Sequence, residues 1–486
     1  MRNSTSIFIR LLWVPSPRPS PGGRGRNAPR RLARLRAVSA QQPSEFLKAG
    51  NGCSLSSGER VWGRRTQKFL CSLFFCVLIL SLHAQDAVTT LAGQALVSGV
   101  ANGTGTNAAF SDPAAMVVDA NGNLFVADSQ NHAIRKITTN GVVTTFAGQL
   151  GVAGSAPGTG TAAQFNSPCG LAFDQAGNLY VSDTGNNLIR KITHSGAVST
   201  VAGVAGAGGF LDGATGSALF SSPLGIAVAP NGTVYVADSG NHCIRKISGG
   251  VVSTFAGSPQ VWGSADGKGP QAQFNGPVGL VFDSRTNLFV SDANNDTIRK
   301  IAPDGTVTTF AGAAGLDGAA DGDLSSARFR SLAELTFDRQ GSLFVADSLN
   351  QTVREISMNG IVSTVCGAAG IYGLDDGMNG AGKFFNPYGI VVAADGSLRV
   401  ADTYNELVRT VLVPFRLTLQ ISGSPPAATL SWDAVIGKQY QVQFKNDLAA
   451  AWANLGASVT ATNLNLNATD NNGAGPQHFY RVLVTP

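Results

Sequence analysis

An aspartate and an arginine recur seven residues apart at six places in this chain of 486 residues. A carboxylate and a guanidinium that flank a hairpin turn can face each other and form a charge-assisted hydrogen bond. Six matching aspartates could instead form a ring of ligand-binding carboxylates. Because one site needs no sixfold copy, we interpret the pairs as structural. They are Asp128/Arg135, Asp183/Arg190, Asp238/Arg245, Asp292/Arg299, Asp347/Arg354 and Asp402/Arg409.

Glu334 is the one catalytic candidate, because it departs from the pattern around it. Phe329 is followed by Arg-Ser-Leu-Ala-Glu, where most other copies read Phe-x-x-Pro-x-Gly. A lone carboxylate at the start of an innermost strand, by the mouth of a central channel, could coordinate a metal or act as a general base. The alternative is a solvated side chain or a partner for Arg328 or Arg330. The residues do not decide between these readings.

Aromatic, acidic and imidazole side chains make up the predicted ligand-binding face. Tyr388, Tyr404 and Glu406 suit stacking on a sugar or a peptide. His132 and His242 occupy matching loop positions two repeats apart, too far apart to share a zinc ion with ligands at about 2 Å. We interpret their position as an ordinary variable one in a loop, since the other copies carry Asn187, Asp296, Gln351 and Glu406 there.

Calcium is the one cofactor that the loop acids suggest. Asp317, Asp321 and Asp323 are the best cluster, because hard cations prefer several oxygen ligands. The alternative is that the repeated Asp-Gly element only makes turns. We favour the turns, because no complete calcium-loop motif with a terminal Glu is present. No cofactor is therefore expected, with calcium as the alternative.

The elements that carry these residues repeat along the chain. The aspartates of the six pairs are spaced by 54 or 55 residues. Each copy contains four strand-like runs joined by Gly, Asn and Asp; in the second copy they are 170–174, 179–182, 188–193 and 197–202. Four short antiparallel strands make one propeller blade. The last copy lacks its fourth run, and residues 88–93 match the missing run. The sequence predicts an all-β, six-bladed β-propeller over residues 86–413, closed by this N-terminal strand, followed by a small β-sandwich.

The loops between blades run to roughly 15–20 residues, and long loops often carry function. We place binding on the face that they share with the turns between second and third strands. The repeated pattern Pro-x-Gly-Ile/Leu, Leu-Phe/Tyr-Val-Ala/Ser-Asp and Ile-Arg-Lys-Ile resembles NHL repeats over residues 88–413. The resemblance implies a rigid binding platform, although a minority of related propellers are lyases or lactone hydrolases.

The N-terminal part of the chain predicts export. Residues 69–82 form an apolar or small run of 14 residues, too short for a membrane span of about 20 but typical of a signal peptide. We expect a signal peptide over 61–85, preceded by disordered residues 1–60 from a mis-assigned start. Without residues 1–85 the chain has 21 basic and 28 acidic residues, which argues against nucleic acid as a partner. Cys169, Cys243 and Cys366 then remain and are expected as buried free thiols.

Residues 414–486 leave the repeat. Alternating runs such as Leu430-Ser-Trp432, Tyr440-Gln-Val442 and Tyr480-Arg-Val482 resemble a fibronectin type III sandwich. The aromatic side chains are expected in its core.

Together these features predict a binding scaffold that is secreted, periplasmic or on the cell surface. Its partner would be a protein, peptide or carbohydrate, with no membrane span after signal cleavage. The alternative is a metal-dependent lactonase-like or lyase-like enzyme with its site at the channel mouth near Glu334.

Overall fold

The structure, a computed structural model, describes residues 9–10, 87–378, 381–413, 417–422, 427–434, 439–446, 450–462, 465–471 and 479–485. Its described elements are β-strands and single 3-10 turns, so the chain is all-β. Among these residues, no helix has the length and apolarity needed to cross a membrane. The predicted signal peptide at 61–85 and residue 86 lie outside the described residues, as do residues 1–60 apart from β1 (Ile9–Arg10).

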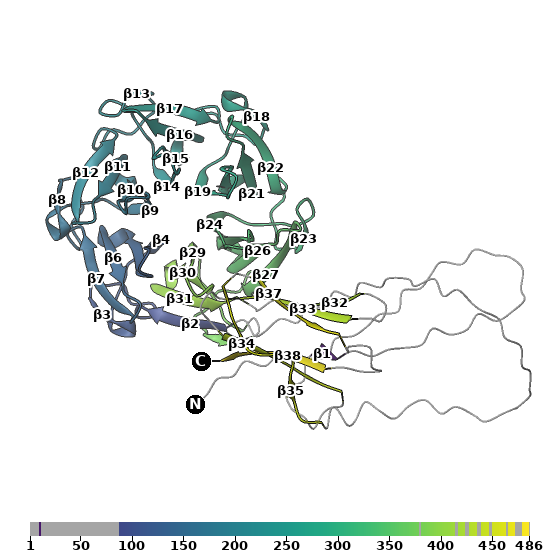
Figure 1. The fold of residues 1–486 in the computed structure, drawn as a ribbon. Helices are drawn as coiled ribbons and strands as arrows, with labels where there is room; N and C mark the ends of the chain where they lie inside the picture. Colours follow the sequence, from purple (N-terminus) through teal and green to yellow (C-terminus); the bar gives the residue numbers. More distant parts are fainter. Residues whose placement is uncertain are drawn as a thin grey trace, which may run out of the picture.

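Within residues 87–413, the described strands form six sheets of five antiparallel strands each. The sheets stand around a ring in Figure 1, consistent with a β-propeller. The innermost strands are β4 (Pro113–Val118), β9 (Pro168–Phe173), β14 (Pro223–Val228), β19 (Pro277–Phe282), β24 (Leu332–Phe337) and β29 (Pro387–Val392). The second strands are β5 (Leu124–Asp128), β10 (Leu179–Asp183), β15 (Val234–Asp238), β20 (Leu288–Asp292), β25 (Leu343–Asp347) and β30 (Leu398–Asp402).

The third and fourth strands complete the predicted pattern. The third strands are β6 (Ala133–Ile137), β11 (Leu188–Ile192), β16 (Cys243–Ser248), β21 (Thr297–Ile301), β26 (Thr352–Ile356) and β31 (Leu407–Leu412). The fourth strands are β2 (Ala87–Ala92), β7 (Val142–Ala147), β12 (Ala197–Ala202), β17 (Val251–Ala256), β22 (Thr306–Gly312) and β27 (Ile361–Gly367). The runs expected in the second copy agree with β9 to β12 to within two residues at each end.

Each sheet also has a fifth strand of two residues, which the four-strand expectation missed. This strand lies in the long loop before the innermost strand and pairs with the fourth strand. The fifth strands are β3 (Gly103–Thr104), β8 (Gly158–Thr159), β13 (Gly213–Ala214), β18 (Gly267–Lys268), β23 (Gly322–Asp323) and β28 (Gly377–Met378). Part of each long loop is therefore fixed to the outer edge of its own sheet.

Short 3-10 turns occupy two kinds of connection. One kind links each second strand to its third strand, and the other lies inside three of the long loops. The first kind comprises η2 (Ser129–Asn131), η4 (Thr184–Asn186), η5 (Ser239–Asn241), η7 (Ala293–Asn295), η8 (Ser348–Asn350) and η9 (Thr403–Asn405). The second comprises η1 (Gly105–Asn107), η3 (Gly160–Ala162) and η6 (Gly269–Gln271).

The first and last parts of this region share one sheet, as predicted. Strand β2 pairs antiparallel with β31, with Val88 opposite Val411 and Thr90 opposite Arg409. Val88 is 2% exposed and belongs to the same buried cluster as Val411. The innermost strands β29 and β4 also contact each other. The predicted pairing of residues 88–93 with the last copy is thus confirmed.

The innermost strands approach each other closely at a position where four of the six carry glycine. A Cβ on Gly225 would lie 2.0 Å from the Val278 carbonyl oxygen, and one on Gly389 would lie 2.2 Å from that of Ala114. Neither distance is sterically allowed, so a side chain at Gly225 or Gly389 would push the neighbouring strand away. The two other residue types in this column are Ala115 and Glu334. This contact explains the glycine of the Pro-x-Gly element.

The C-terminal region forms two further sheets. One contains β32 (Leu417–Ser422), β33 (Ala427–Asp433) and β37 (Asn465–Asp470). In the other, β34 (Gln439–Lys445) pairs with β35 (Ala453–Asn454), β36 (Val459–Thr460) and β38 (Phe479–Thr485), and β1 pairs with β38. Trp432, Tyr440 and Tyr480 belong to one buried cluster that draws on both sheets, as expected of core aromatics.

The role of β2 can be tested on its buried side. Val88→Asp places a charge without a partner in the core, so we expect a loss of more than about 3 kcal/mol in the free energy of unfolding. Thr89→Asp is the matched control, because Thr89 points to solvent in the same strand, and its effect should stay within about 0.5 kcal/mol. Denaturant unfolding measures both variants. Equal losses would show that β2 is not held by its buried face.

Candidate functional site

The six Asp–Arg pairs are confirmed as buried ion pairs inside the sheets. Their N···O distances run from 2.6 to 2.9 Å, and both side chains are 0% exposed in every pair. The second carboxylate oxygen accepts the main-chain N–H of the residue seventeen positions earlier, such as Ser111 for Asp128. An asparagine three positions later, such as Asn131, donates to the carboxylate and to a loop carbonyl. These contacts assign the pairs to the architecture.

Each arginine also holds the long loop that precedes its sheet. Arg245, for example, donates to the carbonyls of Leu219 and Leu211. Its second guanidinium nitrogen lies 2.6 Å from Asp212 of the Asp-Gly element. The aspartates Asp266, Asp321 and Asp376 pair in the same way with Arg299, Arg354 and Arg409. The recurrent loop aspartate is therefore an arginine partner, which fits the turn interpretation better than the calcium interpretation.

The structure does not bring the three candidate calcium ligands together. Asp321 bonds to Arg354, and Asp317 lies 3.4 Å from Arg330. Asp323 accepts hydrogen bonds from Ser325 and Ser326, which lower its pKa to about 2. In the described part of the chain, no group of three or more His, Cys, Asp or Glu side chains could hold a metal ion.

The column that contains His132 and His242 joins neighbouring sheets. All six residues of this column have left-handed backbone angles, with φ between 54° and 62°. Each side chain accepts a hydrogen bond from a main-chain N–H at the start of the next sheet. The acceptors and donors are His132 and Ser167, Asn187 and Ser222, His242 and Gly276, Asp296 and Ser331, Gln351 and Asn386, and Glu406 and Asp112.

We call these six contacts the inter-sheet clasps. The contact from Glu406 to Asp112 measures 2.7 Å and joins the last sheet to the first. The column looked variable because its residue types differ, whereas all of them can accept a hydrogen bond. The predicted ligand-binding residues His132, His242 and Glu406 thus each have a partner within the protein.

The two histidine clasps predict a pH dependence of stability. The Nδ1 atom of His132 and of His242 can accept a hydrogen bond only when the ring is neutral, and burial lowers the pKa of both rings. A group whose pKa falls on folding stabilises the fold fully above its unfolded pKa, about 6.5 here, and this stabilisation is lost as the pH falls through the folded pKa. Protonated Asp or Glu still has a carbonyl oxygen that can accept, so only the histidine clasps fail in acid.

The matched variant is His132→Asn with His242→Asn, because Asn187 already serves as a clasp. Between pH 7 and pH 5 we expect the melting temperature of the unchanged protein to fall further than that of this variant, by at least about 2 °C. Thermal melts by circular dichroism measure the difference. Parallel curves would contradict the contribution of the two imidazoles.

Glu334 lies with Tyr388 and Cys169 on three of the six innermost strands. The Cys169 thiol donates to the Tyr388 hydroxyl at 3.3 Å, and the charge of Glu334 acts on both groups. Tyr388 packs against two buried clusters, so it lies inside the ring of sheets. Burial raises the pKa of Glu334 to about 8 and that of Cys169 to about 12. Near pH 7, Glu334 is therefore largely protonated and Cys169 is a neutral thiol, which is not the nucleophilic form of a cysteine. A carboxyl group with a raised pKa can still take part in proton transfer.

Glu334→Gln should remove a pH-dependent cost of folding. The pKa of Glu334 rises on folding from its ordinary value near 4.3, so its carboxyl group lowers stability progressively as the pH rises from there to about 8. We expect the melting temperature of the variant to exceed that of the unchanged protein by a margin that grows from pH 5 to pH 8 and then stays constant. A margin that does not change with pH would contradict a buried neutral carboxyl group.

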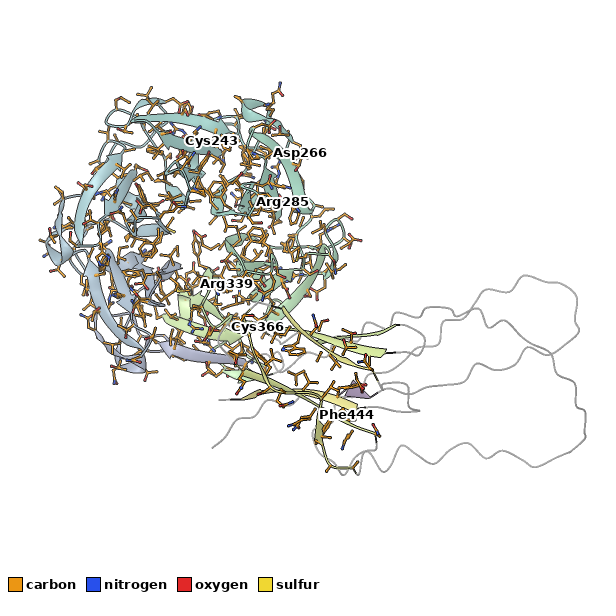
Figure 2. All side chains as sticks on the ribbon, in the orientation of Figure 1. Cys243, Asp266, Arg285, Arg339, Cys366 and Phe444 are labelled. Atoms are coloured by element: carbon orange, nitrogen blue, oxygen red, sulfur yellow. The ribbon has the colours of Figure 1, made fainter. Side chains whose placement is uncertain are left out.

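Cys169, Cys243 and Cys366 are buried, as expected, and Cys169 and Cys243 are free thiols. Cys243 and Cys366 can be located within their sheets in Figure 2. Burial raises the pKa of Cys243, as it does for Cys169. The thiols fit the interpretation as core residues.

The long loops and the second-to-third-strand turns meet on one surface, which we call the long-loop face. Contacts between the two, such as Gly151 N–H to the Asn131 carbonyl, recur around the ring. Of twenty exposed large hydrophobic residues in the described part of the chain, fourteen lie in the long loops or in these turns. They are Leu96, Val97, Val100, Val152, Val204, Leu211, Val261, Trp262, Leu316, Leu349, Ile371, Tyr372, Leu374 and Tyr404. Such a concentration of exposed apolar side chains typically marks a binding surface.

Three aromatic side chains on this face contact one another. Tyr372 stacks on Phe385 with ring centroids 4.8 Å apart and an interplanar angle of 26°. Tyr404 meets Phe385 edge-on at 5.1 Å. We call this cluster the aromatic shelf. Tyr404 was predicted on the ligand-binding face, whereas Tyr372 and Phe385 were not. A phenylalanine at a position where the other copies carry Ser, Asn or Arg could have indicated Phe385.

Comparison with known proteins supports the repeat and the fold. The family model described as NHL repeat matches residues 110–137, 165–192 and 220–247. The chain is 31% identical over 279 residues to Protein SUPPRESSOR OF QUENCHING 1, chloroplastic, of Arabidopsis thaliana, covering 54% of this chain and 26% of that protein. It is 28% identical over 340 residues to NHL repeat-containing protein 2 of Bos taurus, covering 62% and 46%. The chain thus spans between about a quarter and a half of these curated relatives.

Two solved structures from Bacteroides thetaiotaomicron share the fold. A protein described as of unknown function matches with a TM-score of 0.53 and 21% identity, over 68% of this chain and 76% of the other. An auxiliary nutrient binding protein matches with a TM-score of 0.52 and 14% identity, over 67% and 76%. At these identities the likeness concerns the fold alone.

Proposed function

We propose that this chain is an exported binding protein whose long-loop face contacts a protein, peptide or carbohydrate outside the cytoplasm. The proposal takes residues 86–413 as a closed six-bladed propeller and residues 414–486 as a fibronectin type III-like module. Export rests on the predicted signal peptide at 61–85, which leads to secretion, the periplasm or the cell surface.

The observation that carries the proposal is the apolar surface of the long-loop face. Trp262 is 68% exposed and Leu316 56% exposed, and both lie in long loops that follow a fourth strand. Val97, Val152, Val261, Leu316 and Ile371 occupy one turn position in five of the six loops, where each main-chain N–H bonds to the carbonyl three residues earlier. Because exposed apolar area costs free energy in water, its recurrence on one face favours a partner that covers it.

The rigidity of the loops supports the same conclusion. Buried arginines hold the loops through carbonyls and, in four copies, through a loop aspartate. A surface that is already ordered loses little conformational entropy when it binds. The long-loop face is therefore preorganised despite the length of its loops.

The enzyme alternative depends on Glu334, with a metal-dependent lactonase-like or lyase-like reaction. The raised pKa of Glu334 is compatible with a functional carboxyl group, but its neighbours Tyr388 and Cys169 are held inside the ring. Binding is the better supported function, because the exposed apolar side chains of the long-loop face are directly available to a partner.

The proposal predicts that substitutions on the long-loop face reduce binding and that substitutions on the opposite face do not. We expect the purified protein to bind members of an oligosaccharide panel or an array of extracellular peptides. Trp262→Ser with Leu316→Ser should weaken this binding at least tenfold, because it removes exposed apolar contacts. Met358→Ser is the control, since Met358 is 75% exposed in a turn on the opposite face, and its affinity should stay within twofold. Absence of any binding, or an equal loss in the control, would contradict the proposal.

A further inference from the structure

We infer that the aromatic shelf of Tyr372, Phe385 and Tyr404 binds a pyranose ring of a neutral oligosaccharide. This inference rests on the proposed binding function and adds a ligand class and a location. Tyr372 is 66% exposed and Tyr404 50% exposed, whereas Phe385 lies half-buried between them. The ring of Tyr372 rests on Phe385 with one face and turns the other toward solvent.

The fold does not require these rings. At the position of Phe385 the other copies carry Ser111, Asn166, Ser221, Asn275 and Arg330. In all six copies the structural contact is made by the main-chain N–H, which donates to the buried aspartate. At the position of Tyr404 the others carry Gln130, Gly185, Gly240, Asn294 and Leu349. Since five sheets form without an aromatic side chain at either of these two positions, folding does not explain the rings of Phe385 and Tyr404.

The edge of the shelf is polar and balanced in charge. Lys383 forms an ion pair with Asp375 at 2.8 Å, and both side chains are partly exposed. The Lys383 side chain runs over Gly373, since a Cβ on that glycine would lie 2.7 Å from its Cδ. This places the pair beside Tyr372, the preceding residue. The site thus combines flat apolar rings with phenolic hydroxyls, an ammonium group and a carboxylate.

A pyranose ring has the complementary chemistry. Its C–H face is apolar and flat enough to lie on an aromatic ring, while its hydroxyls project from the edge and both donate and accept hydrogen bonds. A tyrosine offers an apolar body and a polar tip in the same way. Because Lys383 and Asp375 neutralise each other, the edge carries no net charge, which favours a neutral sugar over an acidic one.

An apolar peptide is the competing ligand. Its binding would require exposed apolar surface area but not flat aromatic rings. Leu349 shows that leucine is accepted at the position of Tyr404 in the neighbouring sheet, where it is 46% exposed. Tyr372→Leu with Tyr404→Leu therefore keeps apolar area at both positions and removes the flat faces. This substitution separates stacking on a sugar from contact with an apolar chain.

The experiment measures the affinity of the full chain for cellohexaose, xylohexaose, mannohexaose and chitohexaose by isothermal titration calorimetry. We expect at least one to bind, with affinity at least tenfold lower in Tyr372→Leu with Tyr404→Leu. Tyr372→Phe, which keeps the ring, should stay within threefold. Melting temperatures within about 3 °C of the unchanged protein show that the variants are folded.

Each other outcome overturns the inference in a recognisable way. Oligosaccharide binding that survives the leucine variant, or that is lost only in Trp262→Ser with Leu316→Ser, would refute the shelf and leave the binding face intact. Binding to peptides alone, kept by the leucine variant, would assign an apolar peptide as the ligand. No binding to sugars or peptides would remove both the inference and the proposed function.

Discussion

The buried ion pair between aspartate and arginine is the contact on which each sheet, its turn and its long loop depend. Bringing two charges out of water is costly, and the cost is met only when their other hydrogen-bonding atoms are satisfied. Here the carboxylate also takes a main-chain N–H and an asparagine amide, and the guanidinium donates to loop carbonyls. Removing either partner would leave a buried charge without a partner, which lowers the free energy of unfolding by about 3–5 kcal/mol.

Within the described residues, one hydrogen-bonding atom of each arginine has no partner, and a phenylalanine of the long loop lies against the same guanidinium group. The Nε atoms of all six arginines are buried without a hydrogen-bond partner in the described chain. In each copy the phenylalanine that ends the long loop, such as Phe110 or Phe329, lies with its ring centre 5.1 to 5.6 Å from the guanidinium carbon. A cation–π contact therefore adds to the hydrogen bonds that hold the loop.

The sequence allowed the repeat, its four main strands and the role of residues 88–93 to be predicted, because spacing and alternation follow directly from strand geometry. The two-residue fifth strands were missed, since Gly103–Thr104 and its equivalents are too short to show alternation. The inter-sheet clasps were missed for another reason. His132, Asn187 and Glu406 share no residue type, only the capacity to accept one hydrogen bond in a left-handed turn.

The candidate site also had features that could be predicted from the sequence and features that could not. The position of Glu334 was recognisable as a departure from glycine, but the raised pKa of its carboxyl group comes from burial in the folded ring. Tyr388 and Cys169, which the fold brings near it, lie 54 and 165 residues away along the chain. The shelf depends on Tyr372 and Tyr404 both contacting Phe385, and these contacts join a long loop to a separate turn. Spacing along one strand cannot show such a contact.

On the long-loop face, main-chain groups make the contacts that hold the fold, and the side chains of the same residues can vary. This difference makes the face suitable for binding. The buried aspartate fixes the backbone of residue 385 and its equivalents through an N–H that every residue except proline has. The side chain at that position is then free to be serine, asparagine, arginine or phenylalanine without cost to the sheet. A ring built on such contacts can change what it binds while its fold stays the same, so the residues that differ between copies, rather than those that recur, specify the ligand.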